Sequence, residues 1–260
     1  MTFGTALRDW RTARRYSQLD LAAEAGVSQR HLSFLETGRS RPSREMVLHL
    51  SRVLDVPLRR RNDLLVAAGL APEYPATPLE DDVMAPVRDA LQIVVDGAEP
   101  NPAFIVDRLW TLRMTNAAAR RLLPMLVDPA SAAPVAGDPP NLLRLSLHPD
   151  GLRDAIVNFE QAAGAIVERV TREVSADPTD RALADLLDEV TAYPGVPSAG
   201  GEGDGGLVVP VHYRTDDLDL RLFTTIAVVG TPRDVTLDEL RIEWLLPADE
   251  ASRDALAALA

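Results

Sequence analysis

The stretch GVSQRHLSFLETG, residues 26–38, sets an amide, a guanidinium and an imidazole side by side directly after a serine. Gln29 has the groups to form two hydrogen bonds with adenine, and Arg30 has the donors to form two with guanine. Ser28 is a frequent helix N-cap residue, so both side chains would project from the start of a helix, where phosphate is also favoured. Alone, such a stretch also suits a solvated helix face, so its interpretation as a contact with base edges in the major groove of DNA depends on the helices that position it.

Short helices are predicted to position these side chains. Residues 3–15 carry apolar residues at helical spacing, and four further helical runs follow, namely QLDLAAEA, QRHLSFLET, REMVLHLSRVL and LRRRNDLLVAA. Leu32 and Leu35 would face the core of this bundle, which leaves Gln29, Arg30 and Ser33 on the other side of the third run. The pattern is typical of a helix-turn-helix.

Formal charge is distributed unevenly along the chain. Residues 1–70 carry 12 arginines against 7 acidic residues, whereas the whole chain of 260 residues has a net charge of −12 and a pI near 4.8. Because affinity for nucleic acid depends on local rather than total charge, a basic first part joined to an acidic remainder favours DNA binding by the first part.

Composition and proline positions predict two domains in a cytoplasmic protein. Hydrophobic residues make up 46% of the chain, but no run approaches the roughly 20 apolar residues of a membrane helix. Pro72, Pro75 and Pro78 prevent a continuous helix after LLVAAGL. We therefore predict a helix-turn-helix domain over residues 1–70, a proline-rich linker over 71–85 and a second domain over 86–260.

The second domain is predicted to be α+β. Five segments, at 104–107, 110–115, 207–213, 218–229 and 241–247, are rich in β-branched residues and alternate in polarity. Between the second and third segments lie the helical runs NAAARRLL, NLLRLSL, GLRDAIVNFEQAAGAIVERVTREV and DRALADLLDEVTAY, while 127–140 and 194–206 read as loops. This order predicts an antiparallel sheet with helices on one face, a layout that can enclose a pocket.

The stretch SQLDLAAEAGVSQRHLSFLETGRSRPS resembles the lambda-repressor-like, xenobiotic-response-element (XRE) helix-turn-helix family almost without gaps. This resemblance implies double-stranded DNA as a partner. The residues it implicates in DNA binding are Gln18 at a phosphate, Ser28, Gln29, Arg30 and Ser33 at the recognition helix, and Arg39, Arg41 and Ser43 in a loop that contacts the DNA backbone.

Four stretches of the second domain resemble the MmyB-like ligand-binding domain, a PAS-like fold attached to this class of helix-turn-helix. They are PAFIVDRLWTLRMTNAAARRLL, NLLRLSLHPDGLRDAIVNFE, AYPGVP and GTPRDVTLDELRIEWLLPADE. The resemblance implies a transcription regulator whose pocket takes a fatty acid or a similar apolar molecule.

The residues themselves indicate where such a molecule would bind. Apolar side chains alternate along the predicted strands, and Ile156, Phe159, Ala163 and Ile166 form one stripe of the long helical run. Both features are core packing by default, but a sheet facing a helix stripe also builds a cavity. The predicted ligand-binding residues are the apolar Phe104, Trp110, Met114, Phe159, Phe223 and Trp244 and the polar Arg144, His148 and Asn158. Arg144 has the donors to bind a carboxylate through two hydrogen bonds.

The sequence disfavours an enzyme. It has no cysteine, only four histidines and none of the GxSxG, HExxH or phosphate-loop motifs, so we predict no catalysis, no metal and no cofactor. We predict instead a homodimeric transcriptional regulator that binds a palindromic operator and senses an apolar small molecule. The alternative is a helix-turn-helix regulator whose second domain docks a protein partner without a small-molecule effector.

Overall fold

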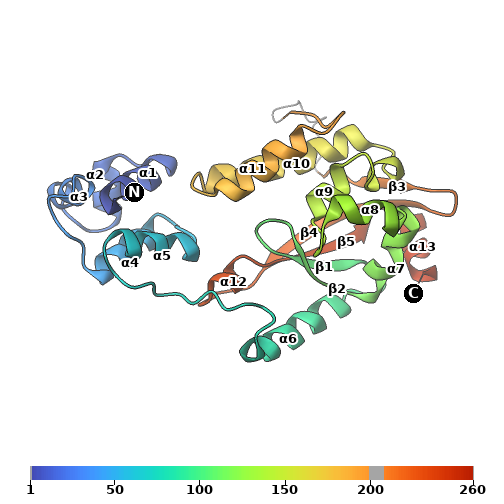
Figure 1. The fold of residues 1–260 in the computed structure, drawn as a ribbon, viewed down its shortest axis with the longest axis horizontal. Helices are drawn as coiled ribbons and strands as arrows, with labels where there is room; N and C mark the ends of the chain where they lie inside the picture. Colours follow the sequence, from blue (N-terminus) through green and yellow to red (C-terminus); the bar gives the residue numbers. More distant parts are fainter. Residues whose placement is uncertain (1, 199–207, 260) are drawn as a thin grey trace. The chain divides into compact units, whose positions relative to one another are not determined.

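The structure, a computed structural model, describes residues 2–198 and 208–259, and the chain divides into two compact units (Figure 1). The first unit runs to Pro78 and also takes in the short segments Ala176–Pro178 and Gly230–Asp238. The second unit contains Leu79–Ser175, Thr179–Val229 and the chain from Glu239 onward. The predicted order of an all-α domain followed by an α+β domain is confirmed. No helix in the described part of the chain is long and apolar enough to cross a membrane.

Five helices open the first unit, as predicted. They are α1 (Phe3–Ala13), α2 (Gln18–Glu24), α3 (Gln29–Glu36), α4 (Arg44–Val53) and α5 (Leu58–Ala67), and the short α12 (Val235–Asp238) belongs to the same unit. The hydroxyls of Ser17, Ser28 and Ser43 each accept a hydrogen bond from the backbone N–H three residues further on. Each cap satisfies a donor that the start of a helix leaves unpaired and contributes about 1 kcal/mol.

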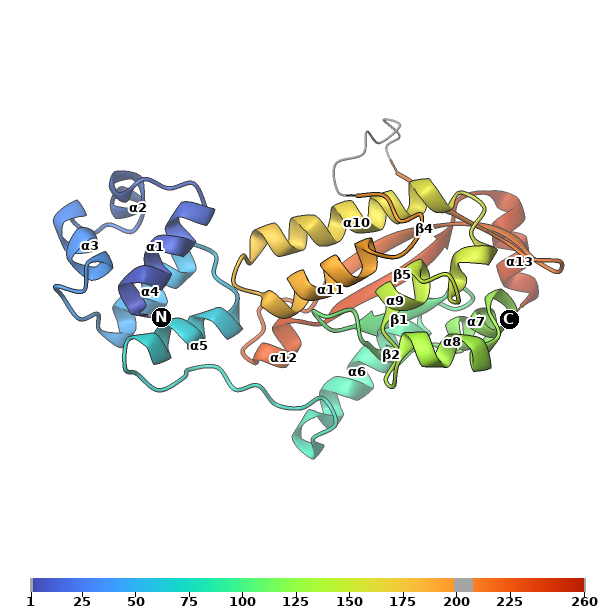
Figure 2. The same cartoon turned by 45° about the horizontal axis from the view of Figure 1, so that its top comes forward.

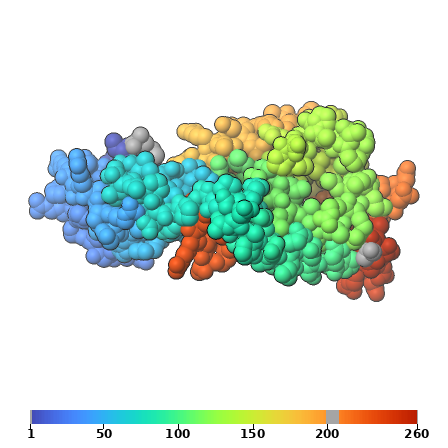
Figure 3. All heavy atoms as spheres, turned by 60° about the horizontal axis from the view of Figure 1, so that its bottom comes forward, coloured from blue at the N-terminus to red at the C-terminus, as the bar shows by residue number. Residues whose placement is uncertain are grey.

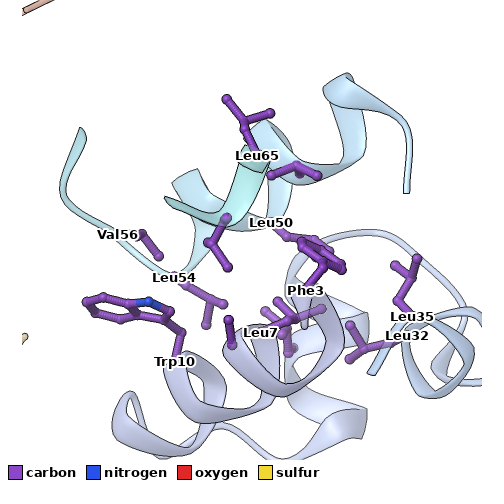
Figure 4. Close-up of a cluster of buried hydrophobic side chains, with 14 of the residues drawn as sticks. Phe3, Leu7, Trp10, Leu32, Leu35, Leu50, Leu54, Val56 and Leu65 are labelled. Atoms are coloured by element: carbon purple, nitrogen blue, oxygen red, sulfur yellow. The ribbon is translucent and has the colours of Figure 1, made fainter. Parts of the chain in front are cut away.

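Apolar side chains from the helices fill the centre of this unit (Figure 4). α1 and α3 approach closely because position 4 is glycine: a Cβ on Gly4 would lie 2.4 Å from the carbonyl oxygen of Glu36 and 2.6 Å from that of Leu35. This packing fixes which side of α3 faces outward. The core residues drawn in Figure 4 include Phe3, Leu7, Trp10, Leu32, Leu35, Leu50, Leu54, Val56 and Leu65.

A five-stranded antiparallel sheet organises the second unit, as predicted. The strands are β1 (Ala103–Val106), β2 (Leu112–Thr115), β3 (Val211–Arg214), β4 (Asp219–Val228) and β5 (Arg241–Pro247), in the order β2-β1-β5-β4-β3. Phe104 pairs with Thr115 on one side and with Glu243 on the other, while Trp244 pairs with Thr225. Because successive side chains along a strand point to opposite faces, Phe104, Thr115 and Glu243 share one face and Trp244 lies on the other.

Helices cover both sides of this sheet, so the prediction of helices on one face is wrong. α10 and α11 run side by side on one side, and α6 lies on the other side against β1 and β2 (Figures 1 and 2). The helical elements of the unit are η1 (Asp82–Met84), α6 (Ala85–Asp96), α7 (Ala117–Leu126), α8 (Pro129–Ala136), α9 (Leu142–Leu147), η2 (Leu152–Ala155), α10 (Phe159–Ala176), α11 (Arg181–Thr191) and α13 (Glu250–Ala258).

Two of the predicted loop and helix boundaries also need correction. The sequence predicts a loop over 127–140, but α8 forms there because Pro129 occupies the first turn, where its missing N–H is not needed, and Asp128 caps the helix. The long helix begins at Phe159 rather than at 151, since a 3-10 turn comes first and Ile156 forms an isolated β-bridge with Tyr213. Within the predicted loop 194–206, residues 199–206 lie outside the described residues.

Candidate DNA-binding surface and candidate ligand cavity

α3 has an exposed beginning and a buried end. Gln29 and Arg30 in its first turn are exposed and Ser33 is half-buried, whereas Leu32 and Leu35 are fully buried. The predicted division between a core face and an outward face of this helix is therefore present in the structure. The outward face brings together an amide, a guanidinium and a hydroxyl, which are the groups that distinguish base edges.

Phe34 holds two arginines beside this face. The guanidinium carbon of Arg30 lies 5.3 Å from the centre of the Phe34 ring, and that of Arg39 lies 5.9 Å from it. Gly38 turns the chain with a φ of +72°, and the backbone N–H of Arg39 then donates to the Phe34 carbonyl. Within residues 2–198 and 208–259, neither these two arginines nor Arg41 pairs with a carboxylate. Their donors are free to meet phosphate or base oxygens.

A buried carboxylate ties α3 to α1 and α2. Glu36, the last residue of α3, accepts hydrogen bonds from Arg11 at 2.6 and 3.2 Å and from the Gln18 amide at 2.8 Å, and Arg8 lies 3.5 Å away. Burial by itself raises the pKa of Glu36, but the hydrogen bonds from Arg11 and Gln18 and the charge of Arg11 outweigh it, so the pKa lies below the ordinary 4.5. This ionised carboxylate holds the end of α3 against α1 and α2.

Three of the predicted DNA-binding side chains have partners inside the protein. Ser28 and Ser43 cap α3 and α4, and the amide of Gln18 donates to Glu36. Each of the three residues therefore has a role in the fold that does not depend on DNA. The structure places all eight predicted residues on α2, on α3 and its N-cap, and in the loop before α4, and their contact with DNA stays a prediction.

An apolar cavity of about 250 Å³ lies in the second unit. All five strands line it together with α7, α9, η2 and α10, and leucines such as Leu122, Leu142, Leu145 and Leu245 form much of its wall. Figure 3 shows this unit hollowed among the green residues. A concave, largely apolar space with a few polar groups is the usual form of a small-molecule site.

One part of the cavity wall carries charges that neutralise one another. Arg169 donates to Glu243 at 2.5 Å and to Glu173 at 3.2 Å, and its guanidinium carbon lies 4.2 Å from the centre of the Trp110 ring. Glu173 also accepts from the Trp110 indole N–H at 3.2 Å and from Arg241 at 2.8 Å. Two arginines thus meet two glutamates, and this part of the wall offers no uncompensated cation to a ligand.

Trp110 lines the cavity in a strained backbone conformation. Its φ is +63°, a region that bulky residues avoid. It lies within a turn in which the Asp107 side chain accepts hydrogen bonds from the N–H groups of Leu109 and Thr111. The ring is 5% exposed and is held by Arg169 and Glu173. Strain of this kind persists only where surrounding contacts determine the conformation, and it is concentrated at functional sites.

Arg120 is the exposed cation among the residues that line the cavity. Its Nη1 donates to the carbonyl oxygen of Thr115 at 2.8 Å, and it makes no ion pair with any residue in the described ranges. It lies on α7, one turn after Asn116, whose buried side chain caps that helix and also accepts from the N–H of Ala103. A carboxylate at this point would meet a free guanidinium.

The predicted ligand-binding residues divide between the two faces of the sheet. Phe104 and Trp110 line the cavity. Met114, Phe223 and Trp244 do not, because each alternates with a residue that does: Thr115, Thr224 and Glu243 point into the cavity, so their neighbours in the strand point away. Alternation in the sequence shows which residues of one strand lie on the same face. It does not show which face of the neighbouring strand lies beside them.

The other predicted ligand-binding residues hold neighbouring segments together and are not among those that line the cavity. Arg144 forms two hydrogen bonds of 2.7 Å with Glu189, which lower the pKa of that carboxyl. His148 accepts from the N–H of Asp150. Asn158 donates to the Pro210 carbonyl and accepts from the N–H of His212, and Arg153 lies over the Phe159 ring.

Sequence reasoning missed Arg120, Arg169, Glu243 and Tyr213. Arg169 has a sequence signal, since it follows the apolar Ile166 by one turn on α10, and Ile166 also lines the cavity. Glu243 has none, because an acid inside an apolar strand is normally read as outward-facing. Only the pairing of β5 with β1 shows that it shares a face with Phe104.

The fold and these sites define a two-unit protein of the helix-turn-helix class, with an α+β unit built around an apolar cavity. Residues 87–259 match the family described as MmyB-like transcription regulator ligand binding domain, and residues 7–60 match the family described as helix-turn-helix. Because the first match covers more than half of the chain, the chain belongs to the family of MmyB-like transcription regulator ligand binding domains. The resemblance to both families is confirmed.

Curated relatives agree with the N-terminal assignment. Uncharacterized HTH-type transcriptional regulators of Mycobacterium tuberculosis and Mycobacterium bovis are 42% identical to this chain over 65 residues, which is 25% of this chain and 25% of each relative. The chain therefore matches about a quarter of the length of each of these relatives.

Proposed function

We propose that this protein is a sequence-specific DNA-binding transcriptional regulator whose second unit binds an apolar small molecule with an acidic head group. The observation that carries the DNA-binding part is the exposed start of α3, where Gln29 and Arg30 stand beside arginines that no carboxylate neutralises within the described ranges. Family membership supports the second part, together with the apolar cavity and Arg120 among its lining residues.

In this proposal two copies of the chain bind a palindromic operator. A helix-turn-helix reads only a few base pairs, and two recognition helices about one turn of DNA apart, roughly 34 Å, give the added specificity that a regulator needs. The ligand alters DNA affinity, and by thermodynamic linkage DNA alters ligand affinity by the same factor.

The DNA-binding part is tested with sites selected from random DNA by the wild-type protein. Arg30→Ala should weaken binding to the selected site by about 1–3 kcal/mol and should change binding to random DNA far less, because base contacts carry the specificity. Arg52→Ala, which removes an exposed arginine from the end of α4, is the matched control. Equal losses on both DNAs for Arg30→Ala would contradict the base-reading role.

The size of the cavity indicates a ligand of moderate length. A cavity of about 150 Å³ holds benzene, so 250 Å³ accommodates about ten non-hydrogen atoms by the same proportion. A fatty acid of about eight carbons fits this space with its carboxylate at Arg120. A longer chain fits only if part of it leaves the cavity.

The ligand-binding part is tested on purified full-length protein. Native mass spectrometry should detect bound lipid-like molecules, and octanoic acid added to stripped protein should raise its unfolding temperature, since a ligand specific for the folded state stabilises it by mass action. Arg120→Ala should reduce this effect for octanoic acid more than for octanol, whereas the exposed Arg172→Ala should not. A folded protein without bound molecules and without a response to any chain length would favour a second unit that docks a protein partner.

A further inference from the structure

Tyr213 stands apart from the other buried polar residues of the cavity wall. The residues of this kind are Trp110, Tyr213 and Glu243, which are 5%, 8% and 3% exposed. Trp110 donates to Glu173 and Glu243 accepts from Arg169. The phenol group of Tyr213 forms no hydrogen bond with any residue in the described part of the chain.

Tyr213 lines the cavity, and its phenol oxygen is accessible. Across the described residues, Arg121 Nε is the single side-chain polar atom that is both sealed from solvent and without a partner. The Tyr213 oxygen has no partner among the described residues and is not sealed from solvent, and its residue is buried among the cavity-lining side chains.

The position of Tyr213 is fixed by its neighbours. On one side it pairs with Leu220 of β4, and on the other it forms the bridge with Ile156. Asn158 holds the same strand through Pro210 and His212. A donor held in this way loses little entropy on binding, as preorganised binding residues do.

The chemistry of the phenol selects its partner. Burial raises the pKa of Tyr213 to about 12, so at neutral pH the group is protonated and donates a hydrogen bond. It belongs to a cluster with Leu122, Leu145 and Leu152. One neutral donor among apolar side chains does not compensate the burial of a carboxylate, whereas it does satisfy a hydroxyl, carbonyl or ether oxygen.

We infer that Tyr213 is a ligand-binding residue whose hydroxyl donates a hydrogen bond to a neutral oxygen of the bound molecule. The ligand class is then an oxygenated medium-chain acid, with its carboxylate at Arg120 and a hydroxyl or carbonyl oxygen at Tyr213. This inference rests on the proposed ligand-binding function.

The experiment compares octanoic acid with 3-hydroxyoctanoic, 8-hydroxyoctanoic and 7-oxooctanoic acid, using wild-type protein and Tyr213→Phe. In wild-type protein at least one oxygenated acid should bind more tightly than octanoic acid, and Tyr213→Phe should weaken that acid by about 5- to 12-fold while leaving octanoic acid unchanged. Without ligand, Tyr213→Phe should unfold at the same temperature as wild type or higher, because it removes an unpaired hydroxyl.

Tyr193→Phe is the matched control. The Tyr193 hydroxyl donates to Glu189 at 2.7 Å and Tyr193 is not among the cavity-lining residues, so this variant should lose stability and keep the wild-type ligand preference. If octanoic acid binds but no oxygenated acid binds more tightly, or if their advantage survives in Tyr213→Phe, the inference is overturned and the proposed function stands. If none of the acids binds and none is found on the purified protein, the inference and the ligand-binding part of the proposed function are both overturned.

Discussion

Replacing Glu36 with glutamine is expected to destabilise the helix-turn-helix unit by about 2–4 kcal/mol. The Glu36 side chain is fully buried, and its carboxylate accepts two hydrogen bonds from Arg11 and one from Gln18. Glutamine keeps the shape, but it presents an NH2 group to donors and removes the negative charge. Arg11, whose side chain is 13% exposed, then lacks its counter-ion, while Arg8 at 52% exposed is compensated by water.

The magnitude follows from these contacts. Hydrogen bonds to charged groups contribute about 1.5–3 kcal/mol and those between neutral groups about 1 kcal/mol. Losing the charge therefore costs about 0.5–2 kcal/mol per bond, or about 1.5–6 kcal/mol over the three bonds, and about 2–4 kcal/mol is the middle of that range. Complete burial of Arg11 would raise this toward the value of about 3–5 kcal/mol that is typical when one partner of a buried ion pair is removed.

Hydrogen exchange measured by mass spectrometry on the full chain reports this loss locally. Peptides covering α1 to α3 should lose protection by about 30- to 700-fold at pH 7, since each 1.4 kcal/mol corresponds to a factor of ten. Glu24→Gln, an exposed charge change on α2, should change protection little.

The same variant has a pH dependence whose sign is fixed by the pKa of Glu36. Because that pKa lies below its ordinary value of 4.5 in the folded chain, the ionised carboxylate stabilises the fold above pH 4.5, and this stabilisation disappears as the pH falls through the lower, folded pKa. The difference between wild type and Glu36→Gln should therefore shrink below pH 4.5. A difference at pH 7 under about 0.5 kcal/mol, the size expected of a surface change, would refute this account of Glu36.

Two further predictions concern the same unit. Arg39→Ala and Arg41→Ala should each weaken binding to all DNA sequences alike. Each should also lower the slope of log affinity against log salt by about 0.9 per lost phosphate contact, and by twice that amount if the protein binds as a dimer. An unchanged slope, measured by fluorescence anisotropy, would count against the contact. Gly4→Ala should destabilise the unit by about 1–3 kcal/mol in urea unfolding, because the added methyl group overlaps the carbonyl oxygens at the end of α3, and a neutral result would show that α1 and α3 can separate without cost.

The sequence predicted the first unit almost completely because its signals are local. Serine caps, glycine stops and the spacing of Leu32 and Leu35 each act within one or two turns, and the structure has five helices where these signals lie. The five strands were equally visible from their composition. Both kinds of signal depend on residues close together in the chain, so no knowledge of distant contacts is needed.

The cavity could be predicted only in part because it depends on strand pairing. The sequence correctly predicts that Phe104 and Trp110 line the cavity. It wrongly predicts the same for Trp244, because the residue that pairs with Phe104 is Glu243, which precedes Trp244 in β5 and points to the opposite face. A shift of one residue in register exchanges the two faces of a strand, and register is set by contacts between segments far apart in the chain. Arg144 was missed as an internal partner of Glu189 for the same reason, since 45 residues separate them.

The two ends of α3 have different tolerances for change. Leu32, Leu35 and Glu36 secure the helix to the core, while Gln29 and Arg30 in the first turn contribute nothing to that core. Substitutions in the first turn are therefore nearly neutral for folding, and surface changes of this kind usually stay within about 0.5 kcal/mol. Related regulators can accordingly diverge in the DNA they recognise by altering these exposed positions one at a time, and an engineer can exchange them without rebuilding the domain.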